Sequence, residues 1–219
     1  MLRIPYLFLL IIPLSIFCAF YEASSDNSDC YDDDDNDTTT TVSDDNITTV
    51  VYTIPATTQL TYSVCPDGWT MFNRTAGDWC IGFYINSTGF DRDQAEEYCN
   101  DLFDATLSGF QTVAEVTTMT ALAIADYSSA AKLYIGAVRS ESCYIQNVSC
   151  TSINSFVWTD NFTTGTDGFS PGTWGSHQPA GWAHHCATLN GTADGLADTT
   201  CNTTLSGAVC GKLATLVYY

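Results

Sequence analysis

The chain has 219 residues, of which 25 are acidic and six are basic, so its formal net charge is −19. This length allows one substantial domain with appendages, or at most two small domains. Phosphate binding needs clustered Lys and Arg, so the charge argues against nucleic acid as a partner. The ten cysteines indicate an oxidising compartment rather than the cytosol. The sequence has no C-x-x-C, H-E-x-x-H or G-x-G-x-x-G motif, which argues against the common metal and dinucleotide classes.

Residues 1–20 are expected to be a secretory signal peptide. Arg3 precedes an apolar stretch from Ile4 to Phe20, and small residues lie near its end at Ala19 and Ala23. The alternative is an uncleaved type II membrane anchor, for which this stretch with its two prolines is short, since about 20 apolar residues span a bilayer. We therefore expect a secreted, extracellular protein that contacts a membrane only if this segment is retained.

Residues 21–61 are expected to form a disordered stalk. The segment is acidic, with a run from Asp32 to Asp35, and then rich in threonine, so it cannot bury enough apolar surface to offset its ordering entropy. The aspartate run lacks the Gly and Glu of an EF-hand loop, which argues against a calcium site there. Cys30 is an odd cysteine in the stalk, and two fates remain open for it: a disulfide-linked homodimer, or capping by a small thiol.

Residues 62–219 are expected to form one folded domain. A turn at Cys65–Trp69 leads into a strand, and Trp79–Ile85 is rich in β-forming residues. Capping patterns at Asp91–Gln94 and Thr112–Glu115 each predict the start of a helix. Helical spacing predicts that the two helices bury Ala95, Tyr98, Cys99 and Leu102, and then Val116, Met119, Ala123 and Ile124.

The second half of this domain predicts strands around a long loop. Leu133–Val138 is typical of a central strand, with Gly136 as a close-packing position. The stretch from Ser140 to His185 has little periodicity, and loops of this length inside a compact domain are usually functional. Two more strands are expected at Cys186–Leu189 and Ala208–Leu213. The order of elements predicts the α+β class, with helices segregated from an antiparallel sheet.

These residues resemble a C-type lectin-like domain of the long form, as found in secreted invertebrate proteins. The resemblance rests on the opening Cys-Pro-Asp-Gly-Trp at Cys65, the helical Cys99, the Leu-Tyr-Ile-Gly strand at Leu133, and the C-x₁₄-C-x₈-C spacing that ends at Cys210. It covers about Tyr62 to Lys212. It implies two helices flanking small antiparallel sheets, with a long irregular loop region and a disulfide framework.

The resemblance implies three of the bridges in a set of eight cysteines that would otherwise allow 105 pairings. The implied pairs are Cys65–Cys80, Cys99–Cys210 and Cys186–Cys201. The remaining Cys143 and Cys150 are close enough in sequence to close a small extra loop.

The resemblance also implies where a calcium-dependent sugar site would lie. In sugar-binding members, the calcium ligands come from a Gln/Glu-Pro-Asp/Asn tripeptide, a Glu two residues before the next cysteine, and an Asn-Asp pair before the cysteine after that. The matching positions here are Gln178–Ala180, His184 and Leu196–Asp198. Only Gln178 and Asp198 keep the expected oxygen, and calcium takes 6 to 8 oxygen ligands, so poor calcium affinity is expected. No other cofactor is expected.

The candidate ligand-binding residues are Gln178, Trp182, His184 and Asp198. Trp182 could stack on a sugar ring, or it could anchor the loop against Trp174 or Phe169. The three histidines invite a second pair of interpretations, a zinc or copper site with Asp198 or ordinary polar loop residues. The histidines are His177, His184 and His185.

Eight N-x-[ST] sequons are expected to place several glycans on the surface. Their acceptors are Asn36, Asn46, Asn73, Asn86, Asn147, Asn161, Asn190 and Asn202. No general acid and base pair or activated nucleophile is evident, so a non-catalytic protein is expected. The sequence therefore predicts an extracellular recognition module that binds glycan or glycoprotein ligands without the usual calcium, and fold-level analogy implies a role in innate immunity. The alternatives are a calcium-dependent lectin and a structural surface glycoprotein without a ligand pocket.

Overall fold

A computed structural model describes residues 41–44, 47–50, 60–127, 131–145, 148–191 and 195–218. The signal peptide expected at residues 1–20 and the aspartate run lie outside the described residues, as does Cys30. The chain divides into two units, Met1–Ala56 and Thr57–Tyr219. None of the helices in the described part of the chain has the length and apolarity needed to cross a membrane.

The first unit contains a short antiparallel ribbon, with strand β1 at Thr41–Asp44 paired to strand β2 at Ile47–Val50. This regular structure differs from the disorder expected for residues 21–61. Its physical basis is the Thr, Val and Ile content of both strands, because β-branched side chains favour extended backbone. For the rest of residues 21–61, the stalk remains a prediction.

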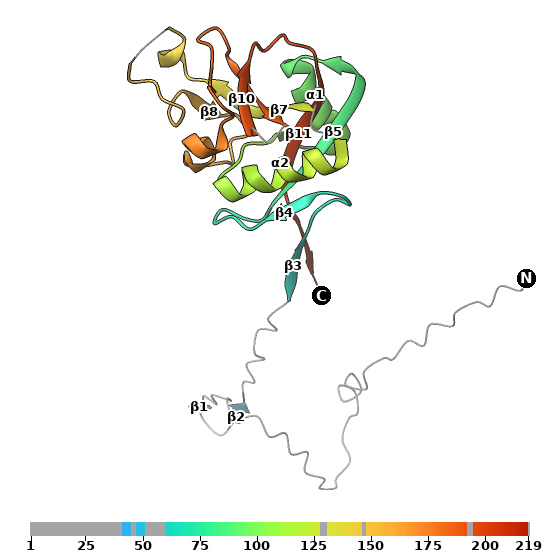
Figure 1. Ribbon diagram of the computed structural model, residues 1–219. Helices are drawn as coiled ribbons and strands as arrows, with labels where there is room; N and C mark the ends of the chain where they lie inside the picture. The colour runs from blue at the N-terminus through green and yellow to red at the C-terminus, as the bar shows by residue number, and fades with distance from the viewer. Residues whose placement is uncertain are drawn as a thin grey trace, which may run out of the picture. The chain divides into compact units, whose positions relative to one another are not determined.

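The second unit is built on a sheet with the strand order β10-β9-β7-β11-β5-β4 (Figure 1). The strands are β4 (Thr70–Phe72), β5 (Trp79–Phe90), β7 (Lys132–Arg139), β9 (Cys186–Asn190), β10 (Gly195–Thr199) and β11 (Leu205–Leu213). Two short strands extend it, β6 (Thr106–Leu107) on β11 and β8 (Phe156–Trp158) on β7. Strand β7 pairs parallel with β11 and antiparallel with β9, which confirms its expected central place.

A separate two-stranded ribbon joins the two ends of this domain. Strand β3 (Thr61–Val64) pairs antiparallel with strand β12 (Thr215–Tyr218), and Figure 1 shows the ribbon projecting from the body of the domain. The sequence did not predict β12, β8 or β10 as separate strands.

Helix α1 (Arg92–Phe103) begins where the sequence predicts. The Asp91 side chain accepts a hydrogen bond from the backbone N–H of Gln94 at 3.0 Å, and the Gln94 side chain accepts one from the backbone N–H of Asp91. This reciprocal pair satisfies two N–H groups that the first turn of a helix leaves without partners. The first capping box is therefore confirmed.

Helix α2 (Val113–Tyr127) has only half of its expected capping box. The hydroxyl of Thr112 accepts a hydrogen bond from the backbone N–H of Glu115 at 3.2 Å, as predicted. The Glu115 carboxylate instead receives the guanidinium of Arg74, 2.6 Å away, and the backbone N–H of Gln111. The expected reciprocal bond is replaced because this buried arginine needs a carboxylate partner.

The sheet buries one face against each helix. On β7, Leu133 and Ile135 face the cluster that contains Met119 of α2, whereas Tyr134 faces the cluster that contains Ala95 and Cys99 of α1. This alternation follows from the period of two along a strand. It places β7 at the centre of the fold, between β9 and β11.

Two of the predicted core residues are wrong. Leu102 is 53% exposed and Ile124 is 36% exposed. In α1 the neighbouring Phe103 makes the inward contact, an edge-to-face contact with Trp69 at 5.5 Å, and in α2 Thr120 is buried instead of Ile124. Helical spacing marks a stripe of positions, but the width of the stripe that touches the sheet is set by packing.

Four disulfide bridges hold the domain together, and they join the same four pairs that were considered from the sequence. The bridges are Cys65–Cys80, Cys99–Cys210, Cys143–Cys150 and Cys186–Cys201. The second bridge ties α1 to β11, and the fourth joins the start of β9 to the loop after β10. The observed architecture is a disulfide-stapled α+β fold.

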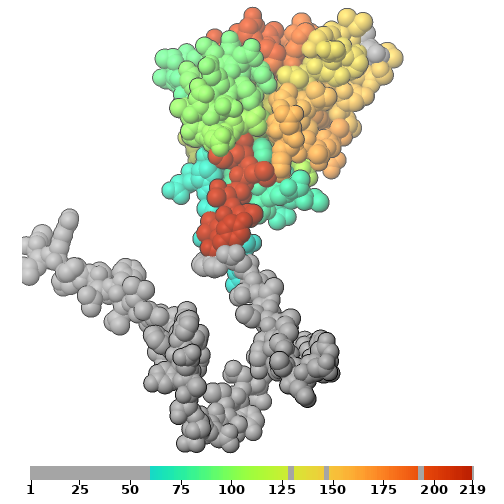
Figure 2. Space-filling view, turned by 180° about the vertical axis from the view of Figure 1, so that it is seen from behind, coloured from blue at the N-terminus to red at the C-terminus, as the bar shows by residue number. Residues whose placement is uncertain are grey.

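The long loop region has its own aromatic core. It includes three short 3₁₀ helices, η1 (Glu141–Cys143), η2 (Asp167–Phe169) and η3 (Pro171–Thr173). The Trp158 ring stacks on Phe169 with ring centroids 3.7 Å apart, and Trp174 packs against Phe156 at 5.2 Å. Figure 2 shows this region, coloured yellow to orange, beside the green surface of the two helices.

Candidate functional site

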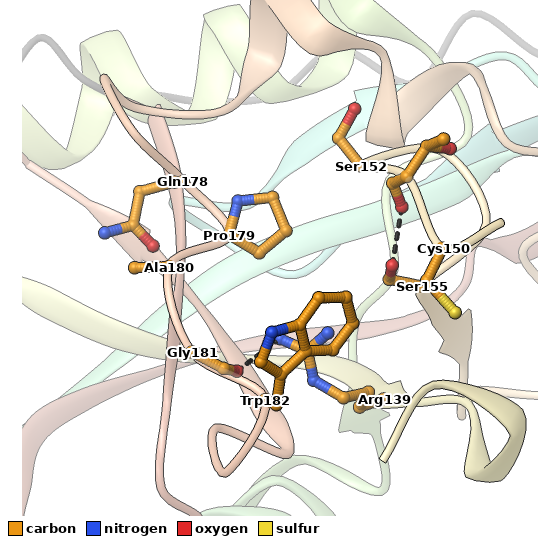
Figure 3. A pocket seen from close by; sticks show the side chains of 10 residues that line it. Arg139, Cys150, Ser152, Ser155, Gln178, Pro179, Ala180, Gly181 and Trp182 are labelled. Carbon is orange, nitrogen blue, oxygen red and sulfur yellow. Dashed lines mark hydrogen bonds between the residues drawn. The ribbon is translucent and has the colours of Figure 1, made fainter. Parts of the chain in front are cut away.

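A cavity of about 290 Å³ opens in the long loop region (Figure 3). The segment Gln178–Gly181 lines one side of it, and Ser152 and Ser155 line the other. Arg139 and Trp182 complete the lining. The cavity therefore brings together two segments of the long loop and the end of the central strand β7.

Arg139 is the last residue of β7, and its guanidinium is buried at this site. Its Nη2 atom lies 2.7 Å from Oδ2 of Asp198 and donates to the carbonyl of Gly181 at 2.8 Å. Its Nε atom donates to the carbonyl of His184 at 2.7 Å. The side chains of Arg139 and Asp198 are 2% and 0% exposed, so this is a buried ion pair.

Burial lowers the pKa of Arg139, and the negative charge of Asp198 opposes that shift. The guanidinium also lies over two aromatic rings, 4.6 Å from the centroid of Phe156 and 5.6 Å from that of Trp182. A buried cation is costly unless it is paired and hydrogen-bonded. Carboxylate, carbonyl and ring contacts all meet this requirement for Arg139.

Asp198 lies on β10 and receives several donors from the loop. Its Oδ1 accepts from the backbone N–H of Ala180 at 2.8 Å and lies 3.2 Å from Nδ1 of His184. Its Oδ2 accepts from the backbone N–H of Gly181 at 3.0 Å. The side-chain oxygen of Gln178 accepts from the backbone N–H of Asp198 at 3.1 Å. Three of the four residues predicted to bind ligand are therefore brought into one network.

Trp182, the fourth predicted residue, is half-buried and lines the cavity. Its ring lies over Arg139, whereas the two rings proposed as its anchor, Trp174 and Phe169, pack against each other at 6.1 Å. The interpretation of Trp182 as an anchor on those rings is thus replaced by a cation–π contact. The indole stays available to the cavity.

Solved structures with a similar chain path support the assignment of the fold, and 187 chains match. Human lithostathine matches with a TM-score of 0.50 and 18% identity, over 68% of this chain and 91% of that chain. The C-type lectin domain of murine dendritic cell inhibitory receptor 2, solved in complex with N-glycan, matches with a TM-score of 0.49 and 19% identity, over 68% and 99%. A calcium-independent type II antifreeze protein matches with a TM-score of 0.49 and 21% identity, over 70% and 98%. The sequence itself matches no protein-family model and no curated protein.

The domain has the C-type lectin-like fold. Two helices, the small antiparallel sheets and the four disulfides of the described domain agree with this assignment. The resemblance drawn from the cysteine spacing is therefore confirmed at the level of the fold.

The calcium positions of the C-type lectin-like fold do not fit a calcium ion in this chain. Ala180 and His184 carry no side-chain oxygen, so the side-chain oxygens at these positions come from Gln178 and Asp198. Those oxygens, and the carbonyl of Gly181, already accept hydrogen bonds from N–H donors. Calcium needs 6 to 8 oxygen ligands with lone pairs directed at it. These oxygen atoms are therefore placed to accept hydrogen bonds from N–H groups rather than to bind a metal ion.

The histidines of the loop do not gather into a metal site. His184 approaches Asp198, but the ring of His185 stacks on Tyr144 with centroids 4.1 Å apart, and His177 is exposed. Adjacent residues of an extended segment point to opposite sides, which separates His184 from His185. Across the described ranges, no group of three or more His, Cys, Asp or Glu side chains is placed to hold a metal ion.

Five of the eight sequon acceptors lie among the residues whose exposure the structure describes. Three are exposed, Asn73, Asn161 and Asn202, and two are half-buried, Asn86 and Asn190. None of these five lines the cavity. The acceptors Asn36, Asn46 and Asn147 lie outside the described residues, and occupancy of all eight remains a prediction.

The residue that sequence reasoning missed is Arg139. Its signal in the sequence is a single cation at the end of an apolar strand, in a chain with only six basic residues. An arginine at a strand end is usually solvated, so the pattern alone does not indicate a buried partner.

Proposed function

We propose that this protein is an extracellular, non-catalytic recognition module that binds glycan or glycoprotein ligands in the cavity beside Arg139, without calcium. The observation that carries the proposal is the cavity itself, which lies next to the network of Gln178 and Asp198. The charge of Arg139 in its lining is already neutralised by the ion pair with Asp198. A volume near 300 Å³ is at the lower end for small-molecule sites, and it suits one sugar ring with part of the next.

The lining of the cavity has the chemistry that a sugar requires. Ser152, Ser155 and the amide of Gln178 supply hydroxyl and amide groups, which can both donate and accept hydrogen bonds. Trp182 supplies an indole face on which the apolar face of a pyranose can stack. The one cation of the lining, Arg139, is paired with Asp198, so we propose a neutral rather than an anionic sugar.

The fold and its bridges fit this role outside the cell, because disulfides persist in oxidising compartments. The murine lectin domain with the same fold was solved with N-glycan, which supports a glycan as the class of partner. A role in innate immunity is proposed by analogy with the fold. Membrane contact and a Cys30-linked homodimer likewise remain proposals.

Of the alternatives, a calcium-dependent lectin is disfavoured by the donor set around Asp198, and a structural surface glycoprotein without a pocket is disfavoured by the cavity. The test is a glycan array probed with the full-length secreted protein, with and without EDTA. We expect a set of neutral glycans to bind equally in both conditions.

Two variants connect any binding to the cavity. Trp182→Ala is expected to weaken binding about fivefold or more, because the loss of a stacking contact and of desolvation costs about 1 kcal/mol or more. Tyr218→Ala, an exposed aromatic on β12, is the matched control and should bind as the wild type does. Loss of all binding in EDTA would refute calcium independence, and an array with no bound glycan would favour the structural glycoprotein.

A further inference from the structure

The buried guanidinium of Arg139 contacts Asp198 and the backbone of His184, two of the positions at which the resemblance implies calcium ligands. We infer that the guanidinium of Arg139 is a covalent replacement for the calcium ion, and that it fixes the shape of the cavity permanently. The inference concerns the same cavity as the proposed function and relies on it only for what the cavity binds. Its tests require no glycan.

The contacts of Arg139 show what it holds together. The last residues of the long loop reach it through the carbonyls of Gly181 and His184, 2.8 and 2.7 Å away. The carboxylate of Asp198, on β10, lies 2.7 Å from the Nη2 atom of Arg139. A guanidinium offers five N–H donors in one plane, so a single side chain can bridge a loop and a strand.

Asp198 binds the same loop segment as Arg139, and we call the two side chains together the Arg139–Asp198 clamp. Its two oxygens accept from the backbone N–H groups of Ala180 and Gly181, at 2.8 and 3.0 Å. Arg139 therefore binds two carbonyl groups of the loop, and Asp198 binds two of its amide groups. Both sets of hydrogen bonds depend on the buried ion pair, because either charge alone would be left uncompensated.

Charge makes Arg139 and a divalent cation mutually exclusive here. The network holds one carboxylate, and the guanidinium already neutralises it. A second cation within a few ångströms would add like-charge repulsion without adding a ligand. The geometry of the cavity is thus independent of calcium concentration, in contrast to a loop that is ordered by a bound ion.

Hydrogen exchange tests the clamp directly. In the wild type, the amides of Ala180 and Gly181 should exchange at the same rate in calcium and in EDTA. In Arg139→Ala they should exchange about tenfold faster or more, since hydrogen bonds to charged groups contribute at least that factor. Arg74→Ala is the matched control, because it also breaks a buried arginine–carboxylate pair but lies away from the cavity. Faster exchange of the wild-type loop in EDTA would overturn the inference, and this measurement needs no variant to fold.

A second experiment asks whether Arg139 is what excludes calcium. Ala180→Asp with His184→Glu restores two carboxylates at the calcium positions, and this double variant is prepared with Arg139 and with Arg139→Ala. We expect calcium to raise the melting temperature only of the protein that lacks Arg139. Equal calcium stabilisation of both proteins would show that Arg139 does not occupy the cation position. If the triple variant fails to fold, Arg139→Lys in the same background is used, and exchange of the backbone amides at positions 180 and 181 is compared with calcium and with EDTA.

Discussion

Arg139 and Asp198 form an ion pair that crosses from the end of β7 to β10, with Nη2 and Oδ2 2.7 Å apart and both side chains almost fully buried. Removing one partner of such a pair leaves an uncompensated buried charge. We therefore expect Asp198→Ala to lower the free energy of unfolding by about 3–5 kcal/mol. The double variant Arg139→Met, Asp198→Ala should recover part of this loss, because no buried charge remains. Urea unfolding of the wild type, both single variants and the double variant measures the coupling.

The outcome that would contradict this prediction is additivity. If the two single losses sum to the loss in the double variant, the pair does not interact in solution. The pair Arg74–Glu115, also buried and 2.6 Å apart, provides an internal comparison. Its own cycle should show coupling, and no combination across the two pairs should.

The buried Tyr134 should make the free energy of unfolding depend on pH in the alkaline range. Its hydroxyl donates toward the carbonyl of Thr203 at 2.6 Å, with the carbonyls of Cys201 and Thr200 close by. Burial, and secondarily the negative charge of nearby Asp91 and Asp93, raises the pKa of Tyr134 from 10.0 to about 12. The folded state therefore holds this proton more tightly than the unfolded state. The resulting stabilisation is fully present below pH 10 and is lost as the pH rises toward 12.

The measurement is urea unfolding of the wild type and Tyr134→Phe across this range. At neutral pH the wild type should be more stable by about 1 kcal/mol, the usual net value of one hydrogen bond. The difference should shrink above pH 10 as Tyr134 ionises. Tyr218→Phe, at an exposed position, should show no such change, and a gap for Tyr134→Phe that stays constant would contradict the prediction.

The parts of this fold that could be predicted from sequence are those specified locally. The capping box at Asp91 and Gln94 lies within one turn of helix, and the period of two in β7 lies within one strand. The disulfide pairs needed the resemblance as well, because spacing alone leaves many pairings open. In each case the information lies in neighbouring residues or in a known framework.

The site could be predicted only in part, for a physical reason. Gln178, His184 and Asp198 were found because they occupy motif positions, but the cation that joins them comes from residue 139, which is 59 positions before Asp198. Similarly, the Glu115 side chain binds Arg74, 41 positions away, instead of the backbone N–H of Thr112 that the capping box predicts. Long-range ion pairs depend on which strand ends the topology brings together, and a local pattern does not carry that information.

Gly136 provides a test of close packing at the centre of the sheet. A methyl group built on Gly136 would overlap the carbonyl oxygen of Leu107, and the backbone N–H of Gly136 is held by the carbonyl of Ser108 at 2.9 Å. The neighbours are backbone atoms, which cannot rotate away as a side chain would. Gly136→Ala should therefore destabilise the domain by about 1–3 kcal/mol or more. Gly172→Ala meets open space and should change the free energy of unfolding by less than about 0.5 kcal/mol in thermal or urea unfolding.

The two bridges Cys143–Cys150 and Cys99–Cys210 should have different roles. The first should matter mainly for ligand binding, and the second mainly for stability. The first closes a loop of sequence separation 7 and the second one of 111. On chain-entropy grounds a loop of about 100 residues contributes about 4.7 kcal/mol and one of about 15 residues about 3 kcal/mol, so the shorter loop should contribute less than either. Cys150 also lines the cavity, whereas Cys99 on α1 and Cys210 on β11 are fully buried and are not among the lining residues.

Replacing both cysteines of each bridge by serine distinguishes these two roles. The Cys143→Ser, Cys150→Ser protein should lose about half as much stability as the protein without the long bridge, but it should bind a glycan found on the array more weakly, because one wall of the cavity is no longer fixed. The Cys99→Ser, Cys210→Ser protein should lose several kcal/mol of stability, while any fraction that remains folded should bind normally. Unchanged binding after removal of the short bridge would show that the Cys143–Cys150 loop does not shape the cavity, and a loss of stability as large as that from the long bridge would contradict the dependence on loop length.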